Sequence, residues 1–459
     1  MKKGILAALC ALLLIALAVS LCVVRTDAPV RPDPVPPEDR EEQEIPEEPE
    51  DPEEPEEPEE PEEPEEPEEP EEPEEPEEPE EPEEPEEPEE PEEPEEPEEP
   101  EEPEEPEEPE ALLAQMTLRQ KVGQVIWILP EQLDPDLAGR NIAGKKITSV
   151  TALTDEMLQT LKDYPAGGFV LFGGNIVDPD QLKALTGQLR AAGSIAPVIA
   201  VDEEGGRVAR IAGNPAFDVP RVGSMASLAE GGDPERVRSA ASGIGAYLAE
   251  FGFSMDLAPV ADMNTNPNNV VIGDRAFGSD PDAVTPMVSA YLEGLHSHGV
   301  KGVLKHFPGH GDTEADTHHG TVTVQKTWDE LLEAELIPFI RNLDRADAVM
   351  VAHITLPNVT SDDLPASLSR QLIHGRLRQE LGYDGLILTD SLSMGAVNDE
   401  FTPGRAALLA FEAGNDVVLM PGNYKEAFES LLAAVESGEI PESRLDESVL
   451  RILRLKMGE

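Results

Sequence analysis

The sequence predicts an α/β fold, a (β/α)8 TIM-type barrel, and three observations support it. Short runs rich in Val, Ile and Leu recur along residues 111–459, stretches with helical periodicity separate them, and several runs end in a polar residue. Runs that are apolar on both faces and alternate with helices indicate a parallel sheet. Eight such units favour a closed barrel, with an open doubly wound sheet as the main alternative.

Eight candidate strands can be assigned in chain order. They are VGQVIWIL from Val122, AGGFVLFG from Ala166, PVIAVDEE from Pro197, GFSMDLAPV from Gly252, VKGVLKHF from Val300, ADAVMVAHI from Ala346, YDGLILTDS from Tyr383 and GNDVVLMPG from Gly414. Between them, DPDQLKALTGQLRAAG and SRQLIHGRLRQELG have the periodicity of amphipathic helices. We expect a single domain at 111–459, because this length suffices for one large core.

Residues 1–25 are expected to form a signal sequence or a membrane anchor. Lys2 and Lys3 precede an uncharged stretch from Ile5 to Val24, which is typical of export signals. The stretch is long enough to span a bilayer, so an uncleaved anchor is the preferred interpretation. Cleavage after Ala18-Val19-Ser20 and lipid attachment at Cys22 are the alternatives. Both cysteines lie in this segment, so the rest of the chain offers neither a disulfide nor a thiolate.

Residues 26–110 are expected to form an extended, disordered stalk. Between positions 31 and 110 there are 49 Asp and Glu against 2 Arg, and a proline stands at every third position from Pro46 to Pro109. Proline at this period prevents helix and sheet, and the segment has almost nothing apolar to bury. Most of the chain's net charge of -65 therefore belongs to a spacer. An acidic arm that binds a basic partner is the alternative interpretation.

Several candidate strands end in polar residues, namely Asp202, Lys305 with His306, His353 and Asp390. In a barrel the carboxyl ends of the strands converge on the face where active sites are built. A single Asp after a strand is often only a turn former or helix cap. That explanation does not account for Lys305 with His306, or for His353, so we expect these residues to surround a site.

The segment KHFPGHGDTEADTHHG, which starts at Lys305, contains four of the eight histidines. Their spacing matches no helical metal-binding pair and no cysteine accompanies them, so metal binding and a merely polar loop remain the weaker alternatives. Asp316 stands two residues before His318. A carboxylate so placed can fix the tautomer of an imidazole and raise its basicity, which suits a proton shuttle on a mobile loop.

Asp390 is the candidate nucleophile. It ends a wholly apolar run and small residues follow it. A carboxylate at the barrel mouth can attack the anomeric carbon of a sugar, while a second group protonates the leaving oxygen. Most such enzymes use two carboxylates. A neutral imidazole as the second group is chemically reasonable, because it avoids repulsion between two anions.

These motifs resemble the glycoside hydrolase family 3 β-N-acetylglucosaminidases of bacterial cell-wall recycling. The resemblance runs from about Met116 to Lys456. It is carried, in the family's order, by AVDEEGGRVAR, LAPVADMNTNPNNVVIGDRAFG, KHFPGHGDTEADTHHG, VMVAHITLP with PASLS, and LILTDSLSM. The resemblance implies that Asp390 is the nucleophile and that His318, oriented by Asp316, is the acid/base. It also implies sugar-binding roles for Asp202, Arg210, Arg275, Lys305 and His306.

The sequence departs from the family in several places. Glu203 stands where the family usually has Gln, a change that is either neutral or alters the charge of the pocket. Residues 129–164 resemble the family less well, and since the sequence ends soon after the eighth unit we expect no second α/β domain of the kind that many members have. Many one-domain relatives lack an export leader, whereas one is expected here.

The resemblance implies a retaining exo-glycosidase that releases terminal β-linked N-acetylglucosamine from peptidoglycan fragments or related glycans. We expect no metal or other cofactor, no nucleic-acid partner, a monomer, and an extracytoplasmic location at the cell envelope with the membrane contacted through the N-terminal segment. A phosphorylase or β-glucosidase of the same family and a noncatalytic surface glycan-binding protein are the alternatives.

Overall fold

The computed structural model describes residues 108–134, 137, 149–313, 320 and 322–458. These residues belong to one compact unit that spans Glu99–Glu459. The predicted leader at 1–25 lies outside the described residues, as does almost all of the predicted stalk. Within the ranges just given, no helix has both the length and the apolar character needed to cross a membrane.

Eight parallel strands form one sheet in the order β11-β9-β7-β6-β3-β2-β1-β12. In chain order they are β1 (Ile126–Ile128), β2 (Gly168–Leu171), β3 (Val198–Val201), β6 (Met255–Asp256), β7 (Lys301–Phe307), β9 (Ala348–Val351), β11 (Leu386–Thr389) and β12 (Val418–Leu419). A parallel bridge between Leu388 and Val417 joins β11 to β12 and closes the barrel. Each strand lies inside one of the eight predicted runs, so the predicted barrel is confirmed.

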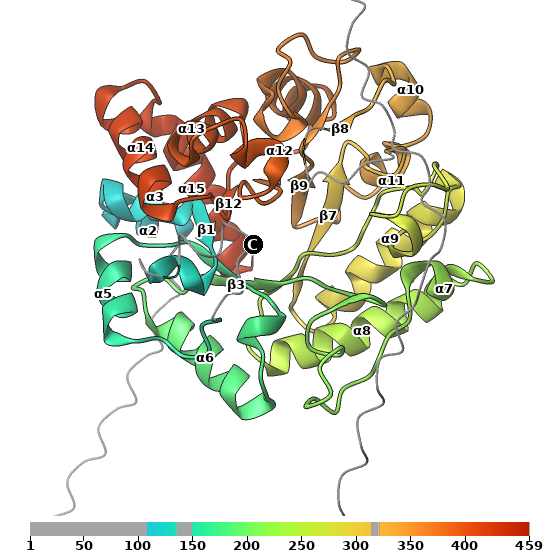
Figure 1. Ribbon diagram of the computed structural model, residues 1–459, viewed down its shortest axis with the longest axis horizontal. Coiled ribbons are helices and arrows are strands. Elements are labelled where there is room, and N and C mark those ends of the chain that lie inside the picture. The colour runs from blue at the N-terminus through green and yellow to red at the C-terminus, as the bar shows by residue number, and fades with distance from the viewer. Residues whose placement is uncertain (1–107, 135–136, 138–148, 314–319, 321, 459) are drawn as a thin grey trace, which may run out of the picture. The chain divides into compact units, whose positions relative to one another are not determined.

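Helices surround the strands in a ring (Figure 1). They are α2 (Pro109–Gln115), α3 (Leu118–Gln124), α5 (Asp155–Asp163), α6 (Pro179–Ala191), α7 (Met225–Ala229), α8 (Pro234–Glu250), α9 (Pro281–His296), α10 (Trp328–Glu333), α11 (Ile337–Ile340), α12 (Gly395–Asn398), α13 (Pro403–Ala413), α14 (Tyr424–Ser437) and α15 (Glu442–Met457). Short 3-10 turns occupy η1 (Pro130–Leu133), η2 (Gly173–Asn175), η3 (Gly273–Arg275) and η5 (Ala366–Leu368).

Local chemistry explains where these helices begin and end. The side chain of Asp178 caps α6 by accepting from the N–H of Gln181, and Pro179 occupies the first helical position. Three leucines of α6 are buried against the barrel. In α14, Asn423 supplies the N-cap and Gly438 ends the helix at a φ of 80°, which favours glycine.

The structure differs from the expected elements at three points. The helix predicted at 369–382 is present as η6 (Gln371–Glu380), but its winding is that of a π-helix. Only two residues of the run from Gly252 are strand, because Pro259 has no N–H to donate. Two small sheets were not predicted: β4 (Glu203–Gly205) with β5 (Val208–Ala209), and β8 (Val322–Thr323) with β10 (Ile354–Thr355).

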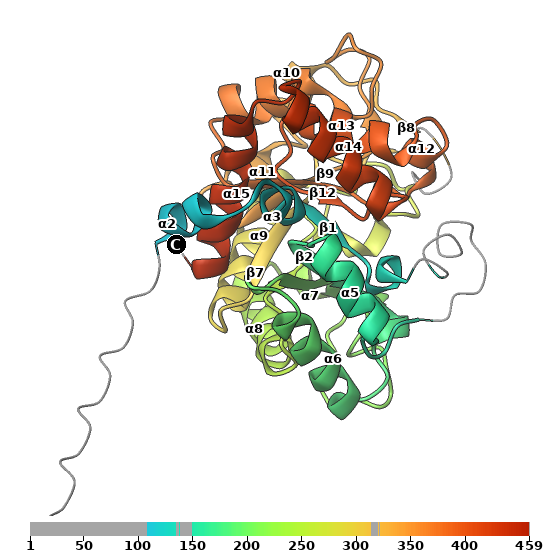
Figure 2. The same cartoon turned by 90° about the vertical axis from the view of Figure 1, so that its left-hand side faces the viewer.

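The barrel has two distinct ends. In Figure 2 the elements β8 and α12, which follow strand carboxyl ends, lie on the right, while α2 and the end of α15 lie on the left. Since all eight strands are parallel, their carboxyl ends share one face. The polar residues predicted to follow β3, β7 and β11 therefore lie at the same end of the barrel.

Candidate active site

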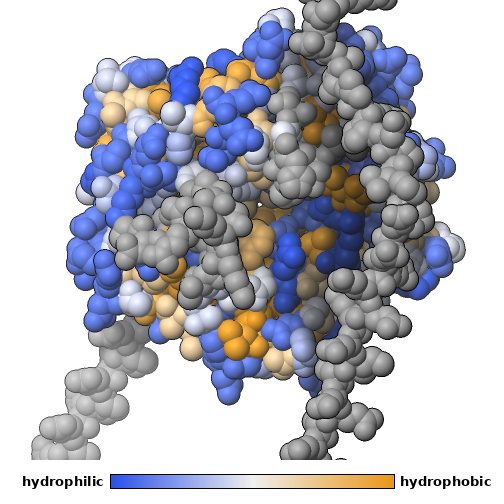
Figure 3. All heavy atoms as spheres, viewed as in Figure 1, coloured by the Kyte–Doolittle hydropathy of each residue, from blue (hydrophilic) through white to orange (hydrophobic). Residues whose placement is uncertain are grey.

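A cavity of about 240 Å³ opens at the carboxyl ends of the strands. Figure 3 looks onto this end and shows a hollow bordered by hydrophilic residues. Six predicted site residues are described, and all of them line the cavity: Asp202, Arg210, Arg275, Lys305, His306 and Asp390. They come from the ends of β3, β7 and β11 and from the loops after β3 and β6. The structure thus brings these side chains together, while their roles stay predictions.

A chain of ion pairs forms one wall of this cavity. Lys305 is buried, and its Nζ lies 2.6 Å from Asp202 Oδ1 and 2.6 Å from Glu204 Oε1. Arg275 donates to the same Glu204 carboxylate through Nε at 2.8 Å and through a terminal nitrogen at 2.7 Å. Two cations and two anions therefore alternate, which leaves each buried charge with an opposite neighbour.

Electrostatics keep this wall ionised. Burial alone raises the pKa of the Glu204 carboxyl, but the charges of Lys305 and Arg275 and their hydrogen bonds lower it well below its usual range. Burial likewise lowers the pKa of Lys305, yet Asp202 and Glu204 raise it above the ordinary lysine value. The wall therefore presents fixed charged donors and acceptors, which suit the hydroxyl and amide groups of a sugar.

Glu204 was missed in the sequence, and for Glu203 the structure favours the first of the two expected outcomes, a neutral change. Glu203 does not line the cavity, so its charge does not enter the pocket. Instead its carboxylate accepts hydrogen bonds from the N–H groups of Arg210, Ile211 and Ala212 and from the hydroxyl of Tyr247. The alternation of side chains along an extended strand could have given the answer, since Asp202 and Glu204 share a face and Glu203 points the other way.

His306 is fixed by a second residue that the sequence did not single out. Its Nδ1 lies 2.6 Å from Oδ2 of Asp262, which is completely buried. The same carboxylate accepts from the backbone N–H groups of His306 and His310. Burial raises the pKa of Asp262, but His306 and His310 lower it below its usual value. The imidazole of His306 is thereby held in one orientation at the cavity wall.

His310 is a second buried imidazole of the cavity. Its ring centroid lies 6.0 Å from that of His306, and its Nδ1 lies 2.9 Å from Thr313 Oγ1. Burial and the neighbouring His306 lower the pKa of His310 below the ordinary value for histidine. A histidine in this setting favours the neutral form and is suited to hydrogen bonding rather than to carrying charge.

Asp390 follows β11 and lines the cavity. Its N–H donates to the carbonyl of Val351 at 2.9 Å, and its Oδ1 accepts from the N–H of Ser391 at 2.7 Å. His353 supports the turn from below, because its Nε2 donates to the carbonyl of Ser391 at 2.8 Å. His353 is buried behind the cavity lining, where it supports Ser391, the residue after Asp390.

Asp316 and His318 lie outside the described residues, so the predicted acid/base pair stays a prediction. The two ends of their loop are described. Asp312 before it and Lys326 after it form an ion pair at 3.4 Å, and Lys326 also pairs with the buried Glu335. These contacts join the entry and exit of the loop beside the cavity.

Arg210 offers the cavity a donor. Its guanidinium lies 5.4 Å from the centre of the Phe172 ring, and both residues line the cavity. Among the residues that the structure describes, its buried Nε has no hydrogen-bond partner. A buried donor of this kind costs free energy until an acceptor arrives, so Arg210 is suited to binding an oxygen of a ligand.

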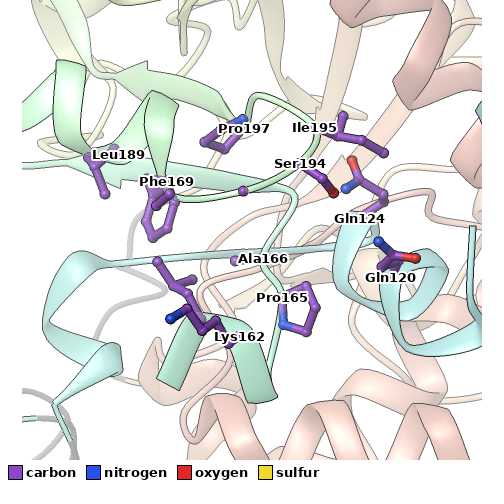
Figure 4. A pocket seen from close by; sticks show the side chains of 13 residues that line it. Gln120, Gln124, Lys162, Pro165, Ala166, Phe169, Leu189, Ser194, Ile195 and Pro197 are labelled. Atoms are coloured by element: carbon purple, nitrogen blue, oxygen red, sulfur yellow. The ribbon is translucent and has the colours of Figure 1, made fainter. Parts of the chain in front are cut away.

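A separate hollow of about 200 Å³ lies near the amino ends of β2 and β3 (Figure 4). Gln120 and Gln124 reach it from α3 and Lys162 reaches it from α5. Lys162 is the one charged residue in its lining, so the hollow lacks paired acid and base groups. In the described ranges, no group of three or more His, Cys, Asp or Glu is arranged to hold a metal ion.

Comparisons with known proteins identify the family of the chain. A model of the glycosyl hydrolase family 3 N terminal domain matches residues 117–455. Beta-hexosaminidase A of Pseudoalteromonas piscicida is 34% identical over 343 residues, which are 68% of this chain and 57% of that protein. Beta-hexosaminidase LpqI of Mycobacterium tuberculosis is 36% identical over 304 residues, covering 64% of this chain and 76% of the relative.

Among solved structures, a glycoside hydrolase family 3 beta-N-acetylglucosaminidase from Paenibacillus sp. str. FPU-7 is similar, with 38% sequence identity and a TM-score of 0.67. The match covers 74% of this chain and 62% of that chain. This chain therefore spans less than two thirds of the length of Beta-hexosaminidase A and of the Paenibacillus enzyme.

Proposed function

The chain belongs to glycosyl hydrolase family 3 and is a glycoside hydrolase, and we propose that it is a retaining exo-β-N-acetylhexosaminidase. One observation carries the proposal. Asp390 shares a single cavity with the ion-paired wall of Asp202, Lys305, Glu204 and Arg275. This combination offers one carboxylate for covalent attack and several fixed donors and acceptors for sugar hydroxyls.

The proposed reaction has two steps. An oxygen of Asp390 attacks the anomeric carbon, the bond to the leaving oxygen breaks, and His318 gives that oxygen a proton. In the second step His318 takes a proton from water, the water oxygen attacks the anomeric carbon, and the carboxylate of Asp390 is released. Asp316 orients His318 throughout. Two displacements at one carbon retain its β configuration.

The proposed substrate is a non-reducing terminal N-acetylglucosamine on peptidoglycan fragments or related glycans. A cavity of about 240 Å³ is smaller than the roughly 300–1,000 Å³ of pockets for larger ligands, which suits a single terminal sugar. Lys305, Arg275 and the unsatisfied Nε of Arg210 provide donors to the hydroxyl and acetamido oxygens. The names of the relatives support the hexosamine preference.

Hydrolysis of p-nitrophenyl N-acetyl-β-glucosaminide, compared with the matching glucoside, tests the proposal. We expect nitrophenol release mainly from the first, and Asp390→Ala should lower kcat by about 10⁴-fold or more. Asp180→Asn, at an exposed position of α6, is the control that should leave kcat unchanged. Absence of release, or full activity of Asp390→Ala, would contradict the proposal. NMR monitoring of the released sugar checks the stereochemistry, because a retaining enzyme forms the β anomer first.

Turnover in phosphate compared with an inert buffer separates hydrolysis from transfer to phosphate. Free N-acetylglucosamine as the product in both buffers supports hydrolysis. A sugar 1-phosphate formed in phosphate buffer would support the phosphorylase alternative instead.

We further propose that residues 1–25 direct export and tether the chain, and that residues 26–110 act as a spacer at the cell envelope. The uncharged stretch from Ile5 to Val24 and the Glu-Glu-Pro repeats support this. Fractionation of cells that express the full chain tests it. Recovery of the enzyme in the cytoplasmic fraction would count against an envelope location.

A further inference from the structure

A second cavity, of about 360 Å³, lies at the opposite end of the barrel from the candidate active site. It opens between η6, the amino end of β11 and α15. Its lining contains four arginines: Arg370, Arg378, Arg444 and Arg451. We refer to it as the arginine cavity. The function proposed above uses none of these residues.

A single buried carboxylate holds three of the four guanidinium groups. Asp416 is completely buried and pairs with Arg378, with Arg451 at 3.3 Å and with Arg444 at 3.7 Å. It also accepts from the N–H of Ile387 and the hydroxyl of Ser448. Asp416 therefore organises the cluster, but one negative charge does not balance three positive ones.

The other carboxylates at the arginine cavity compensate only weakly. The side chain of Asp384 pairs with Arg451 but is 87% exposed, and Glu447 is also exposed. Solvent and salt screen such surface charges. Arg370 donates to the carbonyl of Glu412, and within the described part of the chain it forms no ion pair. Arg378, Arg444 and Arg451 are half-buried, and Arg370 is exposed. With four arginines against Asp416, Asp384 and Glu447, the cavity keeps an excess of one positive charge.

The carboxylates do not compensate the four guanidinium groups equally. Burial lowers the pKa of Arg378 and of Arg444 below the ordinary arginine value, although Asp416 raises both. The pKa of Arg451 is raised, because Asp416 and Asp384 outweigh its burial. Burial and the charges of Arg370, Arg444 and Arg378 also lower the pKa of His374. The local charge contrasts with the domain as a whole, since residues 111–459 carry many more carboxylates than cations.

We propose that the arginine cavity binds a multiply charged oxyanion of the phosphate type. Planar guanidinium groups donate paired N–H groups that match the oxygens of phosphate, and a dianion supplies the charge that Asp416 leaves uncompensated. Arg370 is the arginine that we expect to bind the anion directly. Of the four guanidinium groups, it is the one that forms no ion pair with a carboxylate of the described residues.

Calorimetric titration of the full chain with inorganic phosphate, at constant ionic strength set with chloride, tests the proposal. We expect Arg370→Gln to weaken phosphate binding roughly tenfold, as the loss of one charge-assisted interaction implies. Arg190→Gln is the matched control, since exposed Arg190 also donates to one backbone carbonyl, that of Gly252. It should bind phosphate as the wild type does.

The comparison between variants separates this cavity from the active site. Phosphate bound at the active site by Lys305 or Arg275 would still bind to Arg370→Gln. The proposal is therefore tested only by the loss of phosphate affinity that Arg370→Gln causes. Equal binding by wild type and Arg370→Gln would overturn it. A parallel titration with glycerol 3-phosphate distinguishes free phosphate from a phosphate group on a larger molecule, because tighter binding of the ester indicates the second source.

Discussion

Glu204 determines how two cations of the candidate site are placed. It receives Lys305 at 2.6 Å and holds Arg275 through both carboxylate oxygens. Replacing Glu204 by Gln removes the charge but keeps the shape. Because a broken buried ion pair leaves uncompensated charge, we expect the unfolding free energy to fall by about 3 kcal/mol and kcat/KM to fall about 100-fold.

The control for this prediction is Glu429→Gln. Glu429 pairs with Arg119 at the surface, with both side chains more than 40% exposed, so its loss should cost under about 1 kcal/mol and leave kcat/KM unchanged. Kinetics are measured well below the unfolding transition of each variant. A stability loss in Glu204→Gln without any change in kcat or KM would show a structural role only.

Asp256 links proton binding to stability beneath the site. It is completely buried and accepts from the N–H of Glu203 and the hydroxyl of Tyr291. Burial, with the nearby charges of Glu203 and Asp202, raises the pKa of Asp256 well above its usual value. The folded chain therefore keeps a proton that the unfolded chain loses above about pH 4, and this contribution to stability declines as pH rises.

Asp256→Asn removes that linkage. We expect the unfolding free energy of the wild type minus that of Asp256→Asn to decline as the pH rises from 5 to 8. The decline should be about 1.4 kcal/mol for each pH unit in which Asp256 is protonated in the folded chain and ionised in the unfolded chain. Urea unfolding of both proteins at several pH values measures it. A difference that stays constant across this range would show that Asp256 is ionised in the folded state.

His318 is the predicted proton donor. Its role can be tested by comparing substrates whose leaving groups differ in how much they need a proton. Activated aryl glycosides need little protonation, whereas sugar leaving groups need it strongly. We expect His318→Ala to slow a chitobiose-type substrate at least about 100-fold more than an aryl glycoside. Initial rates on the two substrates give the ratio. Equal losses on both would assign His318 another role.

At this scale the sequence identified Asp202, Lys305, His306 and Asp390 because each ends an apolar run. Arg210 and Arg275 came from the family resemblance alone. Glu204 and Asp262 were missed, because their partners are 71 and 44 residues away in sequence and nothing local marks the pairing. His353 also ends an apolar run, and the structure places it against the carbonyl of Ser391 rather than in the cavity lining.

The loops after β6 and β7 act as one unit at the barrel mouth. The N–H of Asn266 donates to the carbonyl of Gly311, and the side chain of Asn269 donates to the carbonyl of His310. A Cβ at Gly311 would lie 1.6 Å from the carbonyl oxygen of Met263, so a side chain there forces the loops apart. Backbone contacts of this kind cannot relax by a rotamer change.

Gly311→Ala should therefore displace the loop that carries His310 and leads towards His318. We expect kcat/KM to fall at least tenfold and stability to fall by about 1–3 kcal/mol. Gly187→Ala is the control, since a Cβ there meets nothing within 4 Å in the middle of α6 and should add about 0.5–1 kcal/mol. Activity assays and thermal unfolding measure both. Full activity in Gly311→Ala would show that the two loops move independently.

Strands and helices could be predicted where one hydrophobic pattern fits a single kind of secondary structure. The eight strands follow from runs that are buried on both faces, as the fully buried residues of β2 and β3 illustrate. The π-winding of η6 was not predictable, because the same amphipathic pattern fits an α-helix equally well. The pairs β4-β5 and β8-β10 were missed since strands this short carry no periodicity.

Charge is distributed unevenly over the whole molecule. Acidic residues dominate both the Glu-Glu-Pro segment and residues 111–459, yet cations gather at each end of the barrel: Lys305 and Arg275 at the mouth, and four arginines at the opposite end. At the mouth, Lys305 and Arg275 are balanced by Asp202 and Glu204, whereas the arginine cavity is left with excess positive charge. The balanced end suits a neutral sugar, and the unbalanced end suits an anion.

The length of the Glu-Glu-Pro segment gives the last prediction, which concerns reach rather than chemistry. Charge repulsion and proline favour an extended chain of about 3.1 Å per residue, so the 22 prolines at every third position correspond to roughly 200 Å. Deleting half of these repeats should leave kcat/KM on a soluble aryl substrate unchanged. Under the proposed tether at residues 1–25, activity of intact cells on wall-bound glycan should fall several-fold, because the shorter spacer would hold the barrel nearer the membrane.

Replacing the deleted repeats by a Gly-Ser segment of equal length is the control for this test. Such a linker is a random coil with a span that grows only as the square root of its length, so it should restore little of the reach. Release of sugar from labelled wall by intact cells and by detergent-solubilised enzyme gives the comparison. Unchanged release by cells that carry the short segment would show that the repeats serve something other than distance.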